Sequence, residues 1–187
     1  MAGKDNRNCI DDQIVPNPLL TKVKMLGSLP GMIKRYALSE EQALLTLLRY
    51  NRLVDVFTGT TCYSLDNHLR TSMPAIGDVE TDEIYLGIGN TGRQFVFPVQ
   101  ARGRRDHIRI VQTEQDLAVC ASRFPTLDCR PIGAQLIEED LIALFEFERS
   151  EGEISIKAEK HYRIVPNEDL SDDEILAYRS RGSCADS

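Results

Sequence analysis

The stretch from residue 79 to residue 101 most constrains the fold of this chain, because it contains two strand-like runs joined by a glycine turn. Residues 79–88 and 93–101 are rich in β-branched and aromatic side chains. The turn carries glycines at the G-x-G-x-x-G spacing of dinucleotide-binding loops, namely Gly87, Gly89 and Gly92. That pattern needs a helix after its glycines, whereas an aromatic run interrupted by Pro98 follows here. We therefore expect an antiparallel hairpin and no dinucleotide site.

Further patterns predict a mixture of helices and strands around this hairpin. Ser39 and Gln42 form a capping box, and apolar residues recur at near-helical spacing from there to Gly59. We expect one or two short helices within 18–36 and further helices at 63–70, 106–122 and 171–178, with Asp106 as the cap of the helix at 106–122. Strands are expected at 130–137, 141–148 and 153–165. The order predicts an α/β (α+β) fold, a mixed central sheet flanked by helices, with an N-terminal helical extension.

Length and composition predict one globular domain. The chain has 187 residues, of which 42% are hydrophobic, enough for one sizeable core. We expect a flexible N-terminus at 1–16, a single domain at 17–170 with its core at about 39–165, and a C-terminal helix and tail at 171–187. No apolar run approaches the roughly 20 residues that span a bilayer, and no apolar signal core opens the sequence. A cytoplasmic protein without membrane contact is the expectation.

Cysteine and histidine give no sign of a metal or disulfide framework. The five cysteines are an odd number without C-x-x-C pairs, and the three histidines lie far apart. Reduced, mostly buried thiols are the simpler interpretation.

Charge is unevenly distributed along the chain. A net charge of −7 argues against indiscriminate binding of nucleic acid. Nevertheless, residues 93–109 hold five arginines against one aspartate, and residues 138–153 hold seven acids against one arginine. A second basic segment, 22–35, contains no acid. Candidate phosphate-binding residues are Arg104, Arg105, Arg109, Lys34 and Arg35, although such runs are also typical of solvated surfaces.

The open ends of the hairpin bring together groups capable of chemistry. The start of the first strand holds Glu80, Asp82 and Glu83, and the end of the second holds Gln100, Ala101 and Arg102. Antiparallel pairing places these two ends side by side. A hard cation such as Mg²⁺ prefers oxygen ligands, and a partial set is available from Asp82, the side-chain oxygen of Gln100 and the carbonyl of Ala101. Each carboxylate has a simpler interpretation as a solvent-facing strand residue.

This arrangement resembles the PD-(D/E)XK nuclease superfamily, over about residues 39–148. The common core of that superfamily runs helix, three strands, helix, strand, with an acid on one strand and an acid-x-lysine triplet on the next; Mrr-like members have Q-x-K. The resemblance assigns the first acid to Asp82, with Glu80 as the alternative, and the triplet to Gln100-Ala101-Arg102. It adds Glu41 from the preceding helix as a metal ligand.

The resemblance implies a restriction endonuclease-like core and a nuclease that hydrolyses DNA with Mg²⁺ or Mn²⁺ in restriction or repair. Asp82, Gln100 and Arg102 would be its catalytic residues. However, Arg102 stands where the family has lysine, and arginine stays protonated in proteins. The alternative is a catalytically weakened nuclease fold that acts as a nucleic-acid-binding or protein-interaction module. A homodimer would supply the two centres that a double-strand break requires.

Overall fold

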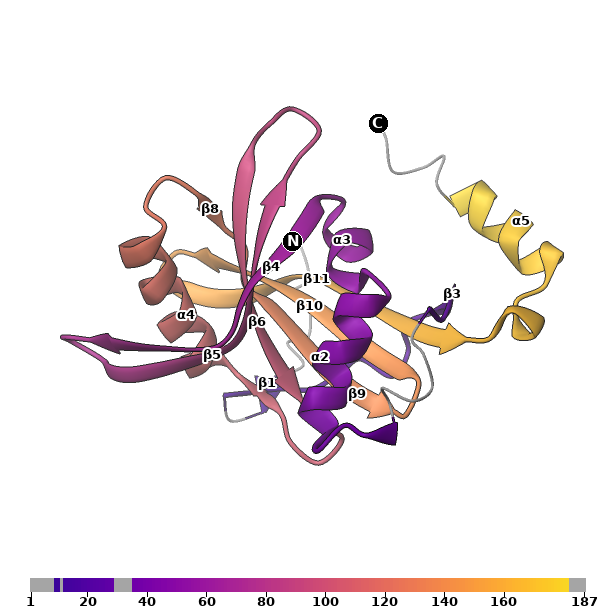
Figure 1. The fold of residues 1–187 in the computed structure, drawn as a ribbon, viewed down its shortest axis with the longest axis horizontal. Helices are drawn as coiled ribbons and strands as arrows, with labels where there is room; N and C mark the ends of the chain where they lie inside the picture. The colour runs from indigo at the N-terminus through magenta and orange to yellow at the C-terminus, as the bar shows by residue number, and fades with distance from the viewer. Residues whose placement is uncertain (1–8, 11, 29–34, 182–187) are drawn as a thin grey trace, which may run out of the picture.

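A computed structural model describes residues 9–10, 12–28 and 35–181, and shows a curled mixed sheet with helices packed on it (Figure 1). The main sheet has strands β3 (Lys22–Leu26), β4 (Thr61–Met73), β5 (Gly77–Ile88), β6 (Gln94–Arg102), β8 (Asp128–Cys129), β9 (Ile132–Glu138), β10 (Leu141–Ser150) and β11 (Glu153–Val165). The helices are α2 (Glu40–Tyr50), α3 (Leu53–Thr58), α4 (Ile110–Arg123) and α5 (Asp172–Arg181), with a 3₁₀ turn at Asn167–Asp169. The expectation of a mixed α/β fold is confirmed.

The order of the strands is β3-β11-β10-β9-β6-β5-β4, with β8 beside β6. Neighbours are antiparallel except for the parallel pairs β6 with β9, β6 with β8, and β11 with β3. The chain passes from β6 through α4 to reach β9, as a parallel neighbour requires. The predicted hairpin is confirmed: the Gly89 amide donates to the Arg93 carbonyl at 2.8 Å, and Gly92 adopts a φ of 84°.

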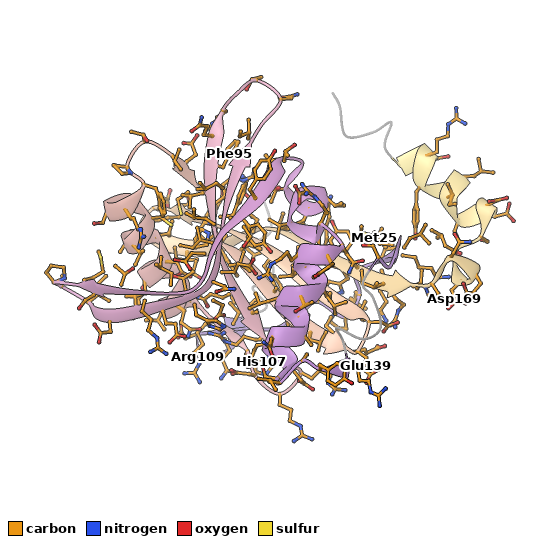
Figure 2. The ribbon with its side chains drawn as sticks, viewed as in Figure 1. Met25, Phe95, His107, Arg109, Glu139 and Asp169 are labelled. Atoms are coloured by element: carbon orange, nitrogen blue, oxygen red, sulfur yellow. The ribbon has the colours of Figure 1, made fainter. Side chains whose placement is uncertain are left out.

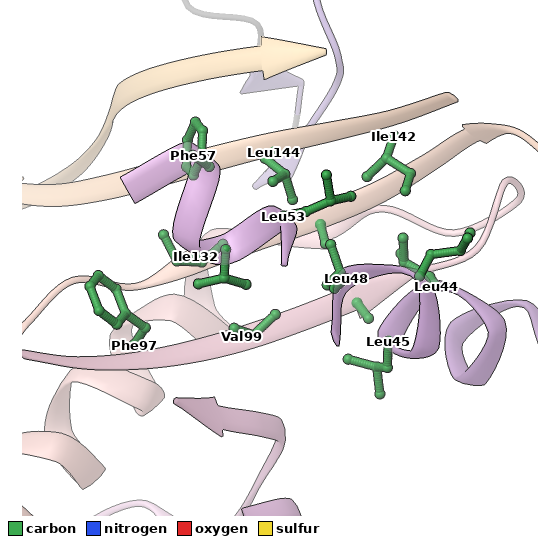
Figure 3. Packing of buried hydrophobic residues seen from close by; sticks show 14 of the residues in the cluster. Leu44, Leu45, Leu48, Leu53, Phe57, Phe97, Val99, Ile132, Ile142 and Leu144 are labelled. Atoms are coloured by element: carbon green, nitrogen blue, oxygen red, sulfur yellow. The ribbon is translucent and has the colours of Figure 1, made fainter. Parts of the chain in front are cut away.

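Helices α2 and α3 cover one face of the sheet. Ser39 caps α2 as predicted, since its hydroxyl accepts the Gln42 amide at 3.1 Å. The leucines of α2 then point inward at helical spacing. They pack with α3 and the sheet in the main core, of which Figure 3 labels Leu44, Leu45, Leu48, Leu53, Phe57, Phe97, Val99, Ile132, Ile142 and Leu144.

Helix α4 packs against β5 and β6 on the opposite face. Ile84 and Val96 contact Val119 and Cys120 of the helix in a second, smaller core. Val96 lies between Phe95 and Phe97 of the main core, so β6 alternates its side chains between the two faces. By this alternation, the residues that follow on the α4 side of β6 are Pro98, Gln100 and Arg102.

Three local predictions were wrong. Residues 63–70, expected to be helical, belong to strand β4, which pairs with β5 from Thr61 opposite Ile88 to Met73 opposite Gly77. Part of the segment 18–36, also expected to be helical, forms β3 and pairs in parallel with β11. In both places, pairing with a neighbouring strand overrides a weak preference of the local sequence for helix.

The third wrong prediction concerns the start of α4. Asp106 was expected to cap this helix, but the helix begins at Ile110 and has no side-chain cap at Arg109. Instead Ile108–Arg109 form a short strand, β7. Strand β7 pairs with β2 (Gln13–Ile14), which pairs with β1 (Cys9–Ile10).

This small sheet adds a third packed cluster. Ile14, only 3% exposed, lies against Ile108, Phe145 and Phe147. Part of the segment 1–16 is thus packed against the body of the protein. No helix in the described ranges is long and apolar enough to cross a membrane.

Leu48 tests the packing of α2. Its side chain is 1% exposed in the main core, and its truncation leaves a cavity that the sheet cannot close. We expect Leu48→Ala to lower the free energy of unfolding by about 2–5 kcal/mol in urea titration. Val56→Ala on α3 removes a side chain that is 51% exposed, so it should change stability by under about 0.5 kcal/mol. Equal effects of the two changes would contradict this packing.

Candidate functional site

Asp82 lies where β5 and β6 separate. Backbone pairing between these strands runs from Ile88 opposite Gln94 to Glu83 opposite Val99. One residue beyond, Oδ2 of Asp82 accepts the Ala101 amide at 2.8 Å and Nη1 of Arg102 at 2.9 Å. The carboxylate thus replaces the backbone carbonyl that the ladder would otherwise supply. Its other oxygen, Oδ1, makes no hydrogen bond to any described residue.

Arg102 is held from several directions. Besides Asp82, its Nη1 contacts the Ala101 carbonyl at 2.6 Å and its Nη2 donates to Oε1 of Gln112 at 2.7 Å. Its Nε lies 3.7 Å from a carboxylate oxygen of Asp106. The side chain is only 12% exposed, so the guanidinium is a fixed positive charge beside Asp82.

Gln100 points toward α4 and is buried. Its Nε2 donates to Oδ2 of Asp116 at 2.6 Å, and Thr81 donates its hydroxyl to Oδ1 of the same carboxylate at 2.5 Å. Oε1 of Gln100 is buried and has no hydrogen-bond partner among the described residues. A buried oxygen without a partner is costly unless another ligand satisfies it.

Asp116 was not predicted, and neither were Gln112 and Thr81. Gln112 and Asp116 are four residues apart, so they share one face of α4, the face turned toward β5 and β6. Two polar residues four positions apart within a predicted helix were a signal that could have been used.

The environment of Asp116 alters its proton affinity. Burial is the largest cause and raises its pKa from an ordinary 3.8 to about 6; the charge of Asp82 raises it further, while the bonds from Thr81 and Gln100 and the charge of Arg102 oppose the rise. Asp82 and Asp116 are therefore close enough to interact electrostatically.

Other predicted metal ligands lie apart from this group. Glu80 is turned outward and pairs across the hairpin with Arg70 at 3.2 Å, with His68 at 3.6 Å. Glu41 is on α2, across the sheet from α4, and forms no hydrogen bond or ion pair with any residue that the structure describes. Its neighbour Glu40 instead binds Arg104, accepting the Arg104 amide and Nε at 2.7 Å each, which lowers the pKa of Glu40.

Glu83, grouped with Asp82 in the prediction, belongs to a separate site on the α2 side. Its side chain is buried, and Oε1 accepts Nε and Nη2 of Arg49 and the hydroxyl of Ser64 at 2.6 to 3.1 Å. Beside it is a pocket of about 210 Å³ lined by Leu48, Arg49, Arg52, Asp55, Cys62, Tyr63, Ser64 and Tyr85. Burial raises the pKa of the Tyr85 hydroxyl, so this group stays protonated.

Only some of the predicted phosphate-binding residues are free of ion pairs within the described ranges. Arg105 and Arg109 are exposed, and neither forms an ion pair within the described ranges, whereas Arg104 is engaged by Glu40. Figure 2 shows His107 and Arg109 along one edge of the molecule. Arg35 is exposed and lies 5.9 Å from the ring centre of Tyr36. Lys34 lies outside the described residues.

Much of the acidic segment 138–153 is neutralised within the fold. Arg163 binds Asp140 at 2.7 Å and Glu138 at 2.8 Å. Glu146, nearly buried, accepts Arg130 at 2.8 Å and Lys157 at 2.9 Å. Burial alone would raise the pKa of Glu146, but these two cations lower it. The charge asymmetry of the sequence is therefore weaker in the folded protein.

The donor atoms around Asp82 suit a hard cation better than a soft one. In the described ranges, no three His, Cys, Asp or Glu side chains gather as a metal centre. Mg²⁺, however, keeps several waters and needs only one or two carboxylates. Oδ1 of Asp82 and Oε1 of Gln100 are oxygens without hydrogen-bond partners among the described residues, and Asp116 contacts Nε2 of the Gln100 amide. The residues therefore fit Mg²⁺ or Mn²⁺.

Comparison of this chain with protein-family models, with curated proteins and with solved structures finds no match.

The raised pKa of Asp116 predicts a pH effect on stability. Between about pH 4 and pH 6 the folded protein keeps a proton on Asp116 that the unfolded chain has lost, so this residue makes the free energy of unfolding fall as pH rises. Two pKa units correspond to roughly 3 kcal/mol. Urea unfolding in a chelator should show Asp116→Asn gaining up to that amount over the wild type between pH 4 and pH 7.

The exposed Asp78 of β5 provides the control, because it is an aspartate without comparable burial. Asp78→Asn should follow the wild-type pH dependence. Parallel curves for wild type and Asp116→Asn would show that Asp116 titrates normally.

Proposed function

We propose that this protein is a metal-dependent nuclease of the PD-(D/E)XK type that hydrolyses phosphodiester bonds in DNA. The proposal is carried by one observation: Asp82 on β5 and the Gln100-Ala101-Arg102 triplet on β6 meet where these strands separate, linked by hydrogen bonds through Ala101 and Arg102. With the short elements α3, β7 and β8 set aside, the order α2, β4, β5, β6, α4, β9 supports it, because it runs helix, three strands, helix, strand. Restriction or repair is the proposed setting.

The residues of the proposed centre have different roles, which follow from their chemistry. Asp82 and Gln100 would hold Mg²⁺ or Mn²⁺ through oxygen atoms. When bound, such an ion neutralises phosphate charge and lowers the pKa of a water ligand, which makes hydroxide available at neutral pH. Arg102 keeps a permanent positive charge next to this position, which stabilises negative charge but accepts no proton.

Plasmid nicking tests the proposal. With Mg²⁺ or Mn²⁺, purified protein should nick supercoiled DNA, and a chelator should abolish the reaction. Asp82→Asn removes a charged ligand worth several kcal/mol of transition-state stabilisation, so the rate should fall by about 100-fold or more. Asp78→Asn, on the same strand but exposed, should stay within about twofold of wild type. Unchanged cleavage by a folded Asp82→Asn protein would rule out this centre.

A second candidate function follows from the ion pair between Arg102 and Asp82. The guanidinium already supplies a positive charge to this carboxylate without any metal. The protein would then be a catalytically weakened nuclease fold that binds nucleic acid through Arg105 and Arg109. Its signature is binding that needs no divalent ion and weakens with salt.

Gel-shift titration in a chelator tests this second candidate. Replacing both Arg105 and Arg109 by alanine removes two phosphate contacts, so affinity at low salt should fall by about tenfold and the salt dependence should become shallower. Arg179→Ala on α5 is the control for loss of an exposed arginine, and it should change neither value. Equal losses in both proteins would indicate nonspecific charge attraction.

A further inference from the structure

A buried carboxylate without a cationic partner lies next to the proposed centre. Asp116 is 1% exposed, and its two hydrogen bonds come from the neutral groups of Thr81 and Gln100. No lysine, arginine or histidine within the described ranges forms an ion pair with it. Buried charges in proteins are normally paired or coordinate metals, because desolvation of an isolated charge is expensive. Asp116 therefore lacks a positive partner.

The side-chain amide of Gln100 lies next to Asp116, where it could contact the same cation. Its Nε2 lies 2.6 Å from Oδ2 of Asp116, while its Oε1 is buried without a hydrogen bond. A half-turn about the last side-chain bond exchanges the nitrogen and the oxygen, which brings Oε1 next to Oδ2. Neighbouring ligands of an octahedral Mg²⁺ ion, with bonds of about 2.0–2.1 Å, are about 2.9 Å apart. The spacing of these two atoms is thus close to that of two oxygens that share a cation.

Three elements contribute to this group. Asp82 comes from β5, Gln100 from β6 and Asp116 from α4. Oδ1 of Asp82 has no hydrogen-bond partner in the part of the chain that the structure describes. Thr81 donates to Oδ1 of Asp116 at 2.5 Å, and Gln100 donates to Oδ2. With the Gln100 amide turned over, each of the three residues would have one oxygen open to a cation.

We propose that Asp116 is a direct ligand of the divalent cation, together with Asp82 and Oε1 of Gln100. The inference rests on the proposed function, and it explains how a site with a neutral glutamine in the triplet keeps two negative charges. Thr81 donates a hydrogen bond to the other oxygen of this carboxylate and is not a ligand. The competing interpretation makes Asp116 only a hydrogen-bond acceptor that holds Thr81 and Gln100 in place.

Calorimetric titration of the full, chelator-treated chain with MnCl₂ separates these interpretations. Asp116→Asn keeps the shape of the side chain and one oxygen but removes the charge, so Mn²⁺ affinity should fall by about tenfold or more. Thr81→Val removes the other hydrogen bond to this carboxylate and leaves every proposed ligand in place, so affinity should stay within about threefold of wild type.

A gain-of-function variant supports the test if Asp116→Asn fails to fold. Gln100→Glu adds a third carboxylate to the group that already contains Asp82 and Asp116. Without metal the two close charges should lower the melting temperature, and Mn²⁺ should restore it and bind about tenfold more tightly than in wild type. Gln100→Glu without any gain in Mn²⁺ affinity would overturn the role of Asp116.

The outcomes distinguish this inference from the proposed function. If wild type binds Mn²⁺, Asp82→Asn loses binding and Asp116→Asn keeps it, the inference is wrong and the nuclease proposal stands. If wild type shows no saturable Mn²⁺ binding, both are wrong. Loss of binding in both variants, with retention in Thr81→Val, supports Asp116 as a ligand.

Discussion

The local structure of the candidate site depends on how the Asp82 carboxylate ends the pairing of β5 and β6. Up to the pair of Glu83 and Val99, the backbones of the two strands are hydrogen-bonded to each other. At the next step the strands diverge, and a side-chain oxygen takes the place of a carbonyl by accepting the Ala101 amide. The same oxygen orients Arg102. Because this bond both closes the ladder and fixes the guanidinium, the architecture of the sheet and the electrostatics of the site are coupled.

Burial then separates the charged groups into two environments. Glu83 faces α2, where Arg49 neutralises it. Asp116 faces β5 and β6 from α4, where its hydrogen-bond partners are neutral and burial raises its pKa. One sheet thus carries a carboxylate paired with an arginine on one side and, on the other, a buried carboxylate that forms no ion pair within the described ranges. The side without the ion pair is the one that favours a cationic ligand, since buried charges are normally paired or coordinate metals.

The hairpin, the capped helix at Ser39 and the three C-terminal strands could be predicted because each depends on local signals: turn glycines, a capping side chain or an alternating pattern. Strand β4 could not, because its sequence lacks a clear period of two and its conformation depends on pairing along β5. The meeting of Asp82 with Arg102 followed from antiparallel register. The contribution of Asp116 did not, since it requires the packing angle of α4, and Glu41 was expected at the centre without knowledge of the face that α2 covers.

The outer edge of the sheet at β4 is irregular. The register of β4 on β5 shifts between Ser64 and Asp66, which leaves Leu65 as an extra residue, and His68 adopts a left-handed φ of 52°. Such interruptions twist a strand and break the even row of amides and carbonyls that a foreign strand would need. Strand β4 is therefore a poor template for edge-to-edge aggregation, although it lies at the edge of the sheet.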